Sequence, residues 1–228
     1  MNQPALAQSV ARFEDDLAKL EENGEDEKAL VVSAEAIRKW PTVTFFHIYR
    51  ARILGNLKRY NEALKCCDKA VALVPKSFEC QDARAEIYYS MGKTAEAIAA
   101  CDRAILLNKD DVGGRRLRAK LNRNIGNYDK AVEDMTYVLV AEKGKRIGDP
   151  SRSRDLEMRG KCYMESKKYQ LAVDDFTTLI KVRMGYGEAY RLRAKAYEAM
   201  GNKEQAKRDM YKAAATGDDW APPGFIGK

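Results

Sequence analysis

Three cations lie on one face of a predicted helix near the middle of the chain. Arg116, Lys120 and Arg123 are spaced by four and three residues, and the helix-forming stretch 112–125 around them holds five cations and no acidic residue. Residues at such steps are neighbours on a helix surface. A row of cations suits the capture of carboxylate or phosphate groups, for which arginine offers two parallel hydrogen bonds. The alternative is a solvated helix whose cations pair with acidic residues of neighbouring segments, such as Glu157.

The sequence shows no arrangement of side chains for catalysis. His47 is the only histidine, and a packing role is favoured for it over a catalytic one. The five cysteines form no C-x-x-C pair, so neither a zinc site nor a disulfide framework is predicted. Cys66 alone is expected to be exposed, and no general base stands beside it. Phosphate-loop, dinucleotide-binding and G-x-S-x-G motifs are absent. We therefore predict no enzymatic activity, no bound metal and no cofactor.

Composition favours a helical protein with a basic surface. Hydrophobic residues make up 45% and charged residues 33% of the 228 residues, which suits helices that bury one stripe and expose the other. The net charge of +7 would attract acidic protein segments, nucleic acid or anionic lipid. No apolar run is long enough to span a bilayer, and the first 20 residues lack the pattern of a signal peptide. A protein without membrane insertion, in the reducing cytoplasm, is expected.

An alanine recurs at a fixed distance along nearly the whole chain. The steps are 34 residues, except for one of 41 between the fourth and fifth positions. The six positions are Ala29, Ala63, Ala97, Ala131, Ala172 and Ala206. In the last five units, the residues four and seven positions further on are apolar, which places them on the same helix face. A period of this size indicates an array of structural repeats.

Alignment on these alanines divides the chain into six units of two helices each. The units are 10–43, 44–77, 78–111, 112–145, 153–186 and 187–220, with an N-terminal extension 1–9, an insertion 146–152 and a tail 221–228. In the third unit the first helix is expected at about 78–91 and ends before Gly92, which can adopt the left-handed conformation. Glycine holds this place in three other units. Lys58 and Lys167 replace it in the remaining two, so those turns are expected to close less comfortably or in a different way.

The insertion precedes a predicted helix start. Asp149 is expected to cap that helix, and Pro150 suits its first turn. We interpret the insertion as a loop extension; the alternative is a basic loop that touches a partner. In the tail, Trp220 and Phe225 are expected either to cover the last repeat or to dock on a neighbouring molecule, which would allow self-association.

The pattern resembles the tetratricopeptide repeat family over residues 10 to about 220. The resemblance rests on the 34-residue helix-turn-helix unit, on small residues and tyrosines in the first helices, and on Tyr-x-x-Ala pairs in the second. These residues are Ala51, Ala85, Ala119, Gly160, Ala194, Tyr88, Tyr163 and Tyr197, with the pairs Tyr60/Ala63, Tyr128/Ala131 and Tyr169/Ala172. The resemblance implies an all-α fold, a right-handed α-solenoid of six tandem repeats. His47 then stands where the family often has a large packing residue.

In this family the first helix of each repeat lines a concave groove that binds the partner. The groove positions implied by the resemblance select nine residues as predicted ligand contacts: Arg52, Asn56, Arg116, Lys120, Arg123, Asn124, Lys161, Arg191 and Lys195. The third unit supplies acidic residues instead, namely Glu79, Asp82 and Glu86. The clamp that chaperone-tail binders of the family use is not matched, because residues such as Ala83 and Gly113 stand at its positions.

The resemblance implies a scaffold or adaptor that binds a protein or peptide segment, with acidic groups, in the groove. The alternative is a nucleic-acid-binding helical repeat protein that uses the basic fourth to sixth units. That alternative is disfavoured, because single-strand binders usually combine cations with stacking aromatic residues, and the groove cations are not interleaved with aromatics.

Overall fold

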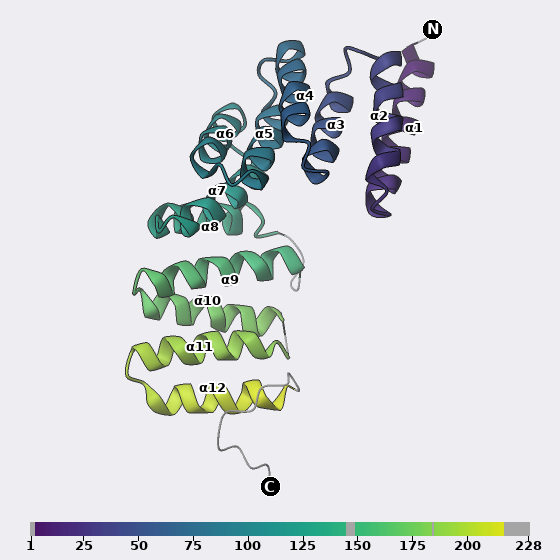
Figure 1. Cartoon of the computed structure of the whole chain (residues 1–228). Coiled ribbons are helices and arrows are strands. Elements are labelled where there is room, and N and C mark those ends of the chain that lie inside the picture. Colours follow the sequence, from purple (N-terminus) through teal and green to yellow (C-terminus); the bar gives the residue numbers. More distant parts are fainter. Residues whose placement is uncertain (1–2, 145–148, 184, 217–228) are drawn as a thin grey trace. The chain divides into compact units, whose positions relative to one another are not determined.

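Twelve α-helices and no β-strand make up the described part of the chain (Figure 1). The structure is a computed structural model that describes residues 3–144, 149–183 and 185–216. It comprises two compact units, Met1–Leu117 (unit 1) and Arg118–Lys228 (unit 2). The predicted all-α fold class is confirmed, and the helices form one pair for each of the six predicted repeats.

In unit 1 the helices pack in chain order, and α3 contacts α5 as well as its two sequence neighbours. The helices are α1 (Gln3–Glu22), α2 (Asp26–Lys39), α3 (Thr44–Asn56), α4 (Tyr60–Leu73), α5 (Phe78–Ser90), α6 (Thr94–Leu107) and the beginning of α7 (Val112–Asn124). The contact between α3 and α5 joins the first helices of two successive repeats. This is the face on which a groove is expected.

In unit 2 the helices also pack one after another. They are the remainder of α7, then α8 (Tyr128–Ala141), α9 (Pro150–Glu165), α10 (Tyr169–Val182), α11 (Gly187–Ala199) and α12 (Lys203–Ala215). Figure 1 shows α9 to α12 as successive layers with alternating direction. Asp149 caps α9 as predicted: its carboxylate accepts the Ser151 N–H at 2.8 Å, and Pro150 lies in the first turn. Residues 145–148 of the insertion, and Trp220 and Phe225 of the tail, lie outside the described residues.

The repeated alanines lie in the core of each unit. All six are at most 2% exposed. In the second and fifth repeats the residues four and seven positions later, Cys67 and Ala70 in α4 and Phe176 and Leu179 in α10, are fully buried. An alanine at this place lets two helices approach closely, and the neighbouring larger side chains then fill the remaining space.

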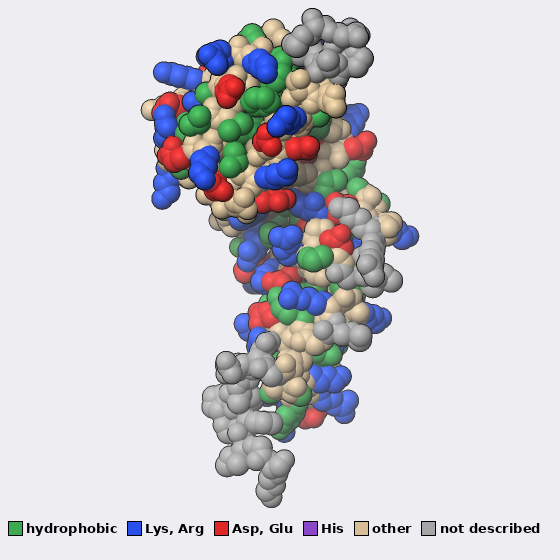
Figure 2. All heavy atoms as spheres, turned by 90° about the vertical axis from the view of Figure 1, so that its right-hand side faces the viewer, with side chains coloured by type: hydrophobic (Ala, Val, Ile, Leu, Met, Phe, Trp, Pro, Cys, Tyr) green, Lys and Arg blue, Asp and Glu red, His purple; other side chains and the backbone are tan. Residues whose placement is uncertain are grey.

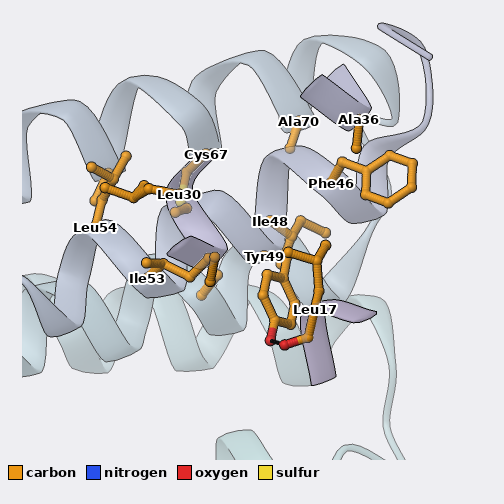
Figure 3. Close-up of a cluster of buried hydrophobic side chains, with 14 of the residues drawn as sticks. Leu17, Leu30, Ala36, Phe46, Ile48, Tyr49, Ile53, Leu54, Cys67 and Ala70 are labelled. Atoms are coloured by element: carbon orange, nitrogen blue, oxygen red, sulfur yellow. Dashed lines mark hydrogen bonds between the residues drawn. The ribbon is translucent and has the colours of Figure 1, made fainter. Parts of the chain in front are cut away.

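The first helix pair is held by an aromatic cluster that its sequence signature does not show. The ring of Trp40 lies 5.0 Å from that of Phe13 and 5.7 Å from that of Phe46, between ring centroids. Leu17 is fully buried in the same core (Figure 3). Helix α1 begins at Gln3, inside the segment predicted as an extension. No glycine or proline interrupts residues 5–22, and Pro4 lies in the first turn, where a proline costs no helix hydrogen bond.

Two turns between paired helices are closed by lysine in a conformation that favours glycine. Lys58 has φ 60° and Lys167 has φ 59°, whereas Gly92 at the equivalent place has φ 73°. The turn at Lys58 makes the same bonds as the turn at Gly92: Arg59 N–H donates to the Leu54 carbonyl at 2.8 Å. The left-handed conformation costs a residue with a Cβ about 1–2 kcal/mol. The expectation that these turns close less comfortably is confirmed.

We expect Lys58→Gly to raise the free energy of unfolding by about 1 kcal/mol, because it removes this strain and leaves the turn bonds in place. Urea-induced unfolding would measure the change. The reverse substitution at the equivalent place, Gly92→Lys, is the matched control and should lower stability by a similar amount. Changes of the same sign in both variants would contradict the strain argument.

Charges of both signs cover the surface. On the face shown in Figure 2, blue Lys and Arg side chains lie among red Asp and Glu side chains, with hydrophobic side chains between them. Part of the positive charge of the sequence is therefore balanced locally. In unit 2 a recurring ion pair crosses each helix pair. Arg118, Arg159 and Arg193 each donate two hydrogen bonds to the aspartate sixteen residues later, namely Asp134, Asp175 and Asp209.

Candidate functional site

A hollow of about 630 Å³ opens in unit 1 between α3 and the start of α5. Helix α3 and the segment 74–79 form its walls. The lining residues are Thr44, Phe45, Ile48, Tyr49, Arg52, Val74, Lys76, Ser77, Phe78 and Glu79. Most of this lining is apolar, with cations at its edge from Arg52 and Lys76. We call this hollow, together with the smaller one beside it described below, the α3–α5 groove.

Two aromatic side chains on successive turns of α3 form one wall of the groove. The centroids of the Phe45 and Tyr49 rings lie 5.7 Å apart. Phe45 is 37% exposed, whereas Tyr49 and Ile48 are 9% and 8% exposed. Phe45 is therefore the member of this wall that offers most of its surface to a ligand, and the other two form the floor behind it.

Hydrogen bonds to α1 hold the Tyr49 ring in place. Its hydroxyl lies 2.6 Å from the Leu17 carbonyl oxygen and 2.9 Å from Glu21 Oε2, and it donates its proton to these acceptors (Figure 3). Burial, and then the bond to Glu21, raise the pKa of Tyr49 above its ordinary value, so the phenol stays protonated. A side chain fixed in this way keeps the wall preformed, which lowers the entropic cost of binding a ligand.

Arg52 lies between the hollow and a smaller one of about 40 Å³ further along the same two helices. Its Nε donates to Glu86 Oε2 at 3.1 Å, and its side chain remains 44% exposed. The smaller hollow is lined by Arg52, Gly55, Asn56, Glu86, Ile87 and Ser90. Gly55 lies close to the other wall, since a Cβ there would be 3.4 Å from Ile87 Cγ1, in ordinary van der Waals contact. Of the predicted contacts, Arg52 lines both hollows and Asn56 lines the smaller one.

The start of α5 forms the opposite edge of the groove. Ser77 caps this helix, since its hydroxyl oxygen accepts the Cys80 N–H at 3.3 Å. The same hydroxyl donates to Glu79 Oε2 at 2.7 Å, which holds this carboxylate back along the helix. Lys76 is exposed beside it. A ligand carboxylate would therefore find cations at Lys76 and Arg52, and would be repelled at Glu79.

Three of the predicted contact residues in unit 2 are only partly available to a ligand. Lys161 donates to Glu157 on its own helix, and Arg191 donates to Glu188 at 2.7 Å. Arg123 is half-buried. Glu157, which was expected as a partner of the cations of the fourth repeat, is thus bonded by Lys161 of its own helix.

The remaining predicted contacts differ in exposure. Lys120, Asn124 and Lys195 are exposed, and Arg116 is half-buried. Arg116 and Lys120 each take part in an interaction within the chain. Their role as ligand contacts stays a prediction.

The carboxyl groups of Asp82 and Asp111 form a pair where the first half of α5 meets the start of α7. Asp111 is 5% exposed and accepts the Gly114 N–H at 3.0 Å, while its second oxygen faces Asp82. Gly114 leaves the room for both groups, because a Cβ there would lie 2.1 Å from Asp111 Oδ2 and 3.0 Å from Asp82 Oδ1. Burial, then the charge of Asp111, raise the pKa of Asp82 to about 8. A carboxyl group with this pKa keeps its proton at neutral pH, so we expect Asp82 to be protonated there.

We expect the free energy of unfolding to fall as the pH rises from about 4, the ordinary pKa of aspartate, towards 8. The folded state binds a proton that the unfolded chain has already released in this range, so stability is fully present below the lower value and is lost above the upper one. The loss should be on the order of 1 kcal/mol, since Asp82 is only half-buried. Urea-induced unfolding at several pH values would measure it. Asp82→Asn should flatten the dependence, whereas Asp15→Asn on exposed α1 should not; equal slopes in the two variants would contradict the raised pKa of Asp82.

The cysteines and the histidine have structural surroundings. Cys66 is half-buried rather than exposed, and burial raises the pKa of its thiol. Burial likewise raises the pKa of Cys67 to about 12. His47 is 4% exposed, and its Nε2 lies 2.9 Å from the Pro41 carbonyl oxygen. Among the described residues no group of three or more potential metal ligands occurs, and no described helix is long and apolar enough to cross a membrane.

Most of the apolar lining of the groove was not predicted from the sequence. Phe45 holds the second position of its repeat, which is a groove position of the family, so an aromatic residue there was a usable signal. Val74, Lys76 and Phe78 come from the connection between repeats and the first residue after it. The groove positions of the family lie within the first helices, so they do not indicate these three residues. The arginines of the ion pairs in unit 2 also recur at the repeat period and were visible in the sequence.

Tetratricopeptide repeat family profiles match residues 44–77 and residues 83–145. No curated protein matches the chain by sequence. Among solved structures, PilW, a widely conserved type IV pilus biogenesis factor, is 16% identical with a TM-score of 0.71, over 91% of this chain and 93% of that one. YrrB, a tetratricopeptide repeat protein with an unusual peptide-binding site, is 16% identical with a TM-score of 0.70, over 82% and 93%.

The C-terminal part of a tetratricopeptide repeat-containing protein from Cytophaga hutchinsonii is also similar, with 19% identity and a TM-score of 0.70 over 89% of this chain and 78% of that one. At these identities the likeness concerns the fold. The two profiles match the sequence itself, in the repeats that form the α3–α5 groove and those that follow. Residues 44–77 and 83–145 are therefore tetratricopeptide repeats, the repeat that is typical of protein–protein interaction scaffolds.

Proposed function

We propose that this protein is an adaptor that binds an extended peptide segment in the α3–α5 groove. The observation that carries the proposal is the hollow of about 630 Å³ with Phe45, Ile48, Tyr49 and Phe78 in its lining. A hollow of this size holds a large aromatic or aliphatic side chain. Burial of such a side chain in an apolar pocket is the usual source of affinity at peptide-binding sites.

The cations at the edge of the groove favour a peptide with an acidic group beside its apolar anchor. Lys76 is exposed, and Arg52 keeps unused donors although it binds Glu86. Glu79 and Glu86 restrict where the acidic group can lie. We infer that the carboxylate binds on the Arg52 and Lys76 side of the hollow. YrrB, which has a similar fold, is described by its peptide-binding site, in keeping with this proposal.

We expect Phe45→Ala to weaken peptide binding at least about tenfold, because it removes the exposed wall of the hollow. The probe is a phage-displayed library of random dodecapeptides, selected on the full chain and followed by fluorescence anisotropy of the enriched peptides. Selected sequences should combine a large apolar residue with an acidic one, and Arg52→Gln should weaken the preference for the acidic residue.

Leu106→Ala is the matched control, because Leu106 on α6 is 78% exposed and lies outside the groove lining. It should leave binding unchanged. Peptides that bind the Phe45→Ala and wild-type proteins equally would show that the ligand contacts another surface. The predicted contacts Arg116, Lys120 and Asn124 would then be the next to test.

The alternative of nucleic-acid binding gains little from the groove. Aromatic residues and cations do meet there, but Tyr49 is 9% exposed, and Glu79 and Glu86 would repel phosphates. Filter binding of a single-stranded oligonucleotide at two salt concentrations separates the two functions. Affinity dominated by phosphate contacts falls steeply with salt, whereas anchoring of an apolar side chain does not.

A further inference from the structure

One segment outside the described residues has the chemistry that the α3–α5 groove would accept. Residues 218–226 read Asp-Asp-Trp-Ala-Pro-Pro-Gly-Phe-Ile. They combine two adjacent carboxylates with a tryptophan and a Phe-Ile pair. We propose that residues 218–226 of one molecule bind in the α3–α5 groove of a second molecule, so that the protein associates with itself. This inference rests on the proposed function and names its ligand.

The apolar residues of the segment match the hollow in size and character. A hollow of about 630 Å³ lined by Phe45, Tyr49 and Phe78 can take an indole or a phenyl ring. The other tryptophan of the chain, Trp40, is 6% exposed in the core of unit 1, where it packs on Phe13. Trp40 is thus committed to the core, and we assign the indole in the hollow to Trp220.

The charges are complementary as well. Asp218 and Asp219 directly precede Trp220, so an indole in the hollow places both carboxylates at its edge. The cations there are Lys76, which is exposed, and Arg52, whose side chain is 44% exposed. Arg52 has five N–H donors and can bind a second carboxylate while it keeps its bond to Glu86.

The two prolines favour binding of the segment as an extended chain. Pro222 and Pro223 fix their own φ angles and disfavour helical geometry in the residues before them. An extended Pro-rich segment suits an aromatic-lined groove and loses little conformational freedom when it binds. The ten residues from 217 to 226 can span about 33 Å, so the segment can enter a groove on another molecule while α12 keeps its place.

The proposed interface joins two different surfaces, the α3–α5 groove of one molecule and residues 218–226 of another. Each bound pair leaves one groove and one segment unused, so the assembly grows with concentration unless a ring closes. Phe45→Asp removes the groove function and keeps the segment. Trp220→Ala with Phe225→Ala removes the segment and keeps the groove.

Light scattering of the full chain over a wide concentration range is the test. We expect the mass of the wild-type protein to rise with concentration and each variant alone to remain a monomer. An equimolar mixture of the two variants should form a 1:1 complex and nothing larger, because it contains one working groove and one working segment. Lys76→Glu, at an exposed position where folding is not at risk, should weaken the association as an independent groove variant.

A wild-type protein that stays monomeric, or a mixture of variants that stays monomeric, would overturn the inference. A third result would also overturn it: a synthetic peptide of residues 216–228 binds the variant Trp220→Ala, Phe225→Ala, but the wild-type protein remains a monomer. The segment would then bind in the groove of its own molecule. The proposed function is judged separately by the library-selected peptides. If they bind the wild-type groove but the 216–228 peptide does not, the groove function stands and only the self-association fails.

Discussion

Replacement of Arg159 by leucine is expected to lower the free energy of unfolding by about 3 kcal/mol. Arg159 Nε donates to Asp175 Oδ2 at 2.9 Å, and Nη2 donates to Oδ1 at 2.6 Å. Nη1 donates to Thr136 Oγ1 at 3.1 Å, so one side chain joins α9 to α10 and to α8. The Asp175 side chain is 7% exposed. Without Arg159 this carboxylate would stay buried without a counter-charge.

Burial raises the pKa of Asp175 even with Arg159 in place, and the loss of Arg159 would raise it further. The destabilisation by Arg159→Leu should therefore shrink at low pH, where Asp175 takes up a proton and no longer carries a buried charge. Urea-induced unfolding at pH values near 5 and near 8 would show this difference.

The double variant Arg159→Leu, Asp175→Leu is the informative comparison. Replacement of both partners by apolar residues removes the desolvation cost together with the attraction, so its stability should lie within about 1 kcal/mol of the wild type. Arg154→Leu is the matched control on the same helix, since Arg154 is exposed. If Arg159→Leu were no more harmful than Arg154→Leu, the ion pair would have no structural role.

Gly160→Ala is expected to lower the free energy of unfolding by about 2 kcal/mol through overpacking. A Cβ at Gly160 would lie 2.5 Å from Phe176 Cε1, 2.9 Å from Cζ and 3.0 Å from Cδ1. Phe176 is fully buried, so its ring cannot turn away without moving other core residues. Either the ring or the backbone of α9 must shift.

The repeat pattern explains why glycine stands at this place. The other four repeats from 44 onward have alanine at the position of Gly160, and sixteen residues later they carry cysteine or methionine. The fifth repeat alone combines the smallest residue with the largest ring, which conserves the volume between its two helices.

Gly160→Ala combined with Phe176→Leu should therefore recover part of the lost stability, although Phe176→Leu alone should be destabilising because it leaves a cavity. Gly144→Ala serves as the control, since a Cβ there meets no atom within 4 Å. Thermal unfolding would measure all four variants. Additive effects of the two core substitutions would show that Gly160 and Phe176 do not constrain each other.

The helical repeats were predictable because their signals are local. The period of 34 residues located the helix pairs, and the residue in each turn, such as Gly92, marked the end of a first helix. Where lysine replaces glycine, as at Lys58, the sequence also indicated backbone strain in the turn. The aromatic packing of α1 was not predicted, because Phe13 meets Trp40 and Phe46, which come from segments further along the chain.

The candidate site was predictable in part. The groove positions implied by the family resemblance selected Arg52 and Asn56, which line the groove. They also selected Lys161 and Arg191, which form ion pairs with Glu157 and Glu188. A sequence gives the charges on a helix, and side-chain geometry decides which of them pair with each other.

By itself, the sequence determined that this protein is an array of helix pairs and which alanines and small residues let the helices meet. Those features follow from periodicity and from the steric size of single residues. Only the tertiary structure decided where a ligand-sized hollow opens, because Phe45, Lys76 and Phe78 come together through the packing of α3 against α5 and the connection between repeats. The volume and exposure of such a hollow depend on contacts between residues that are far apart in the chain.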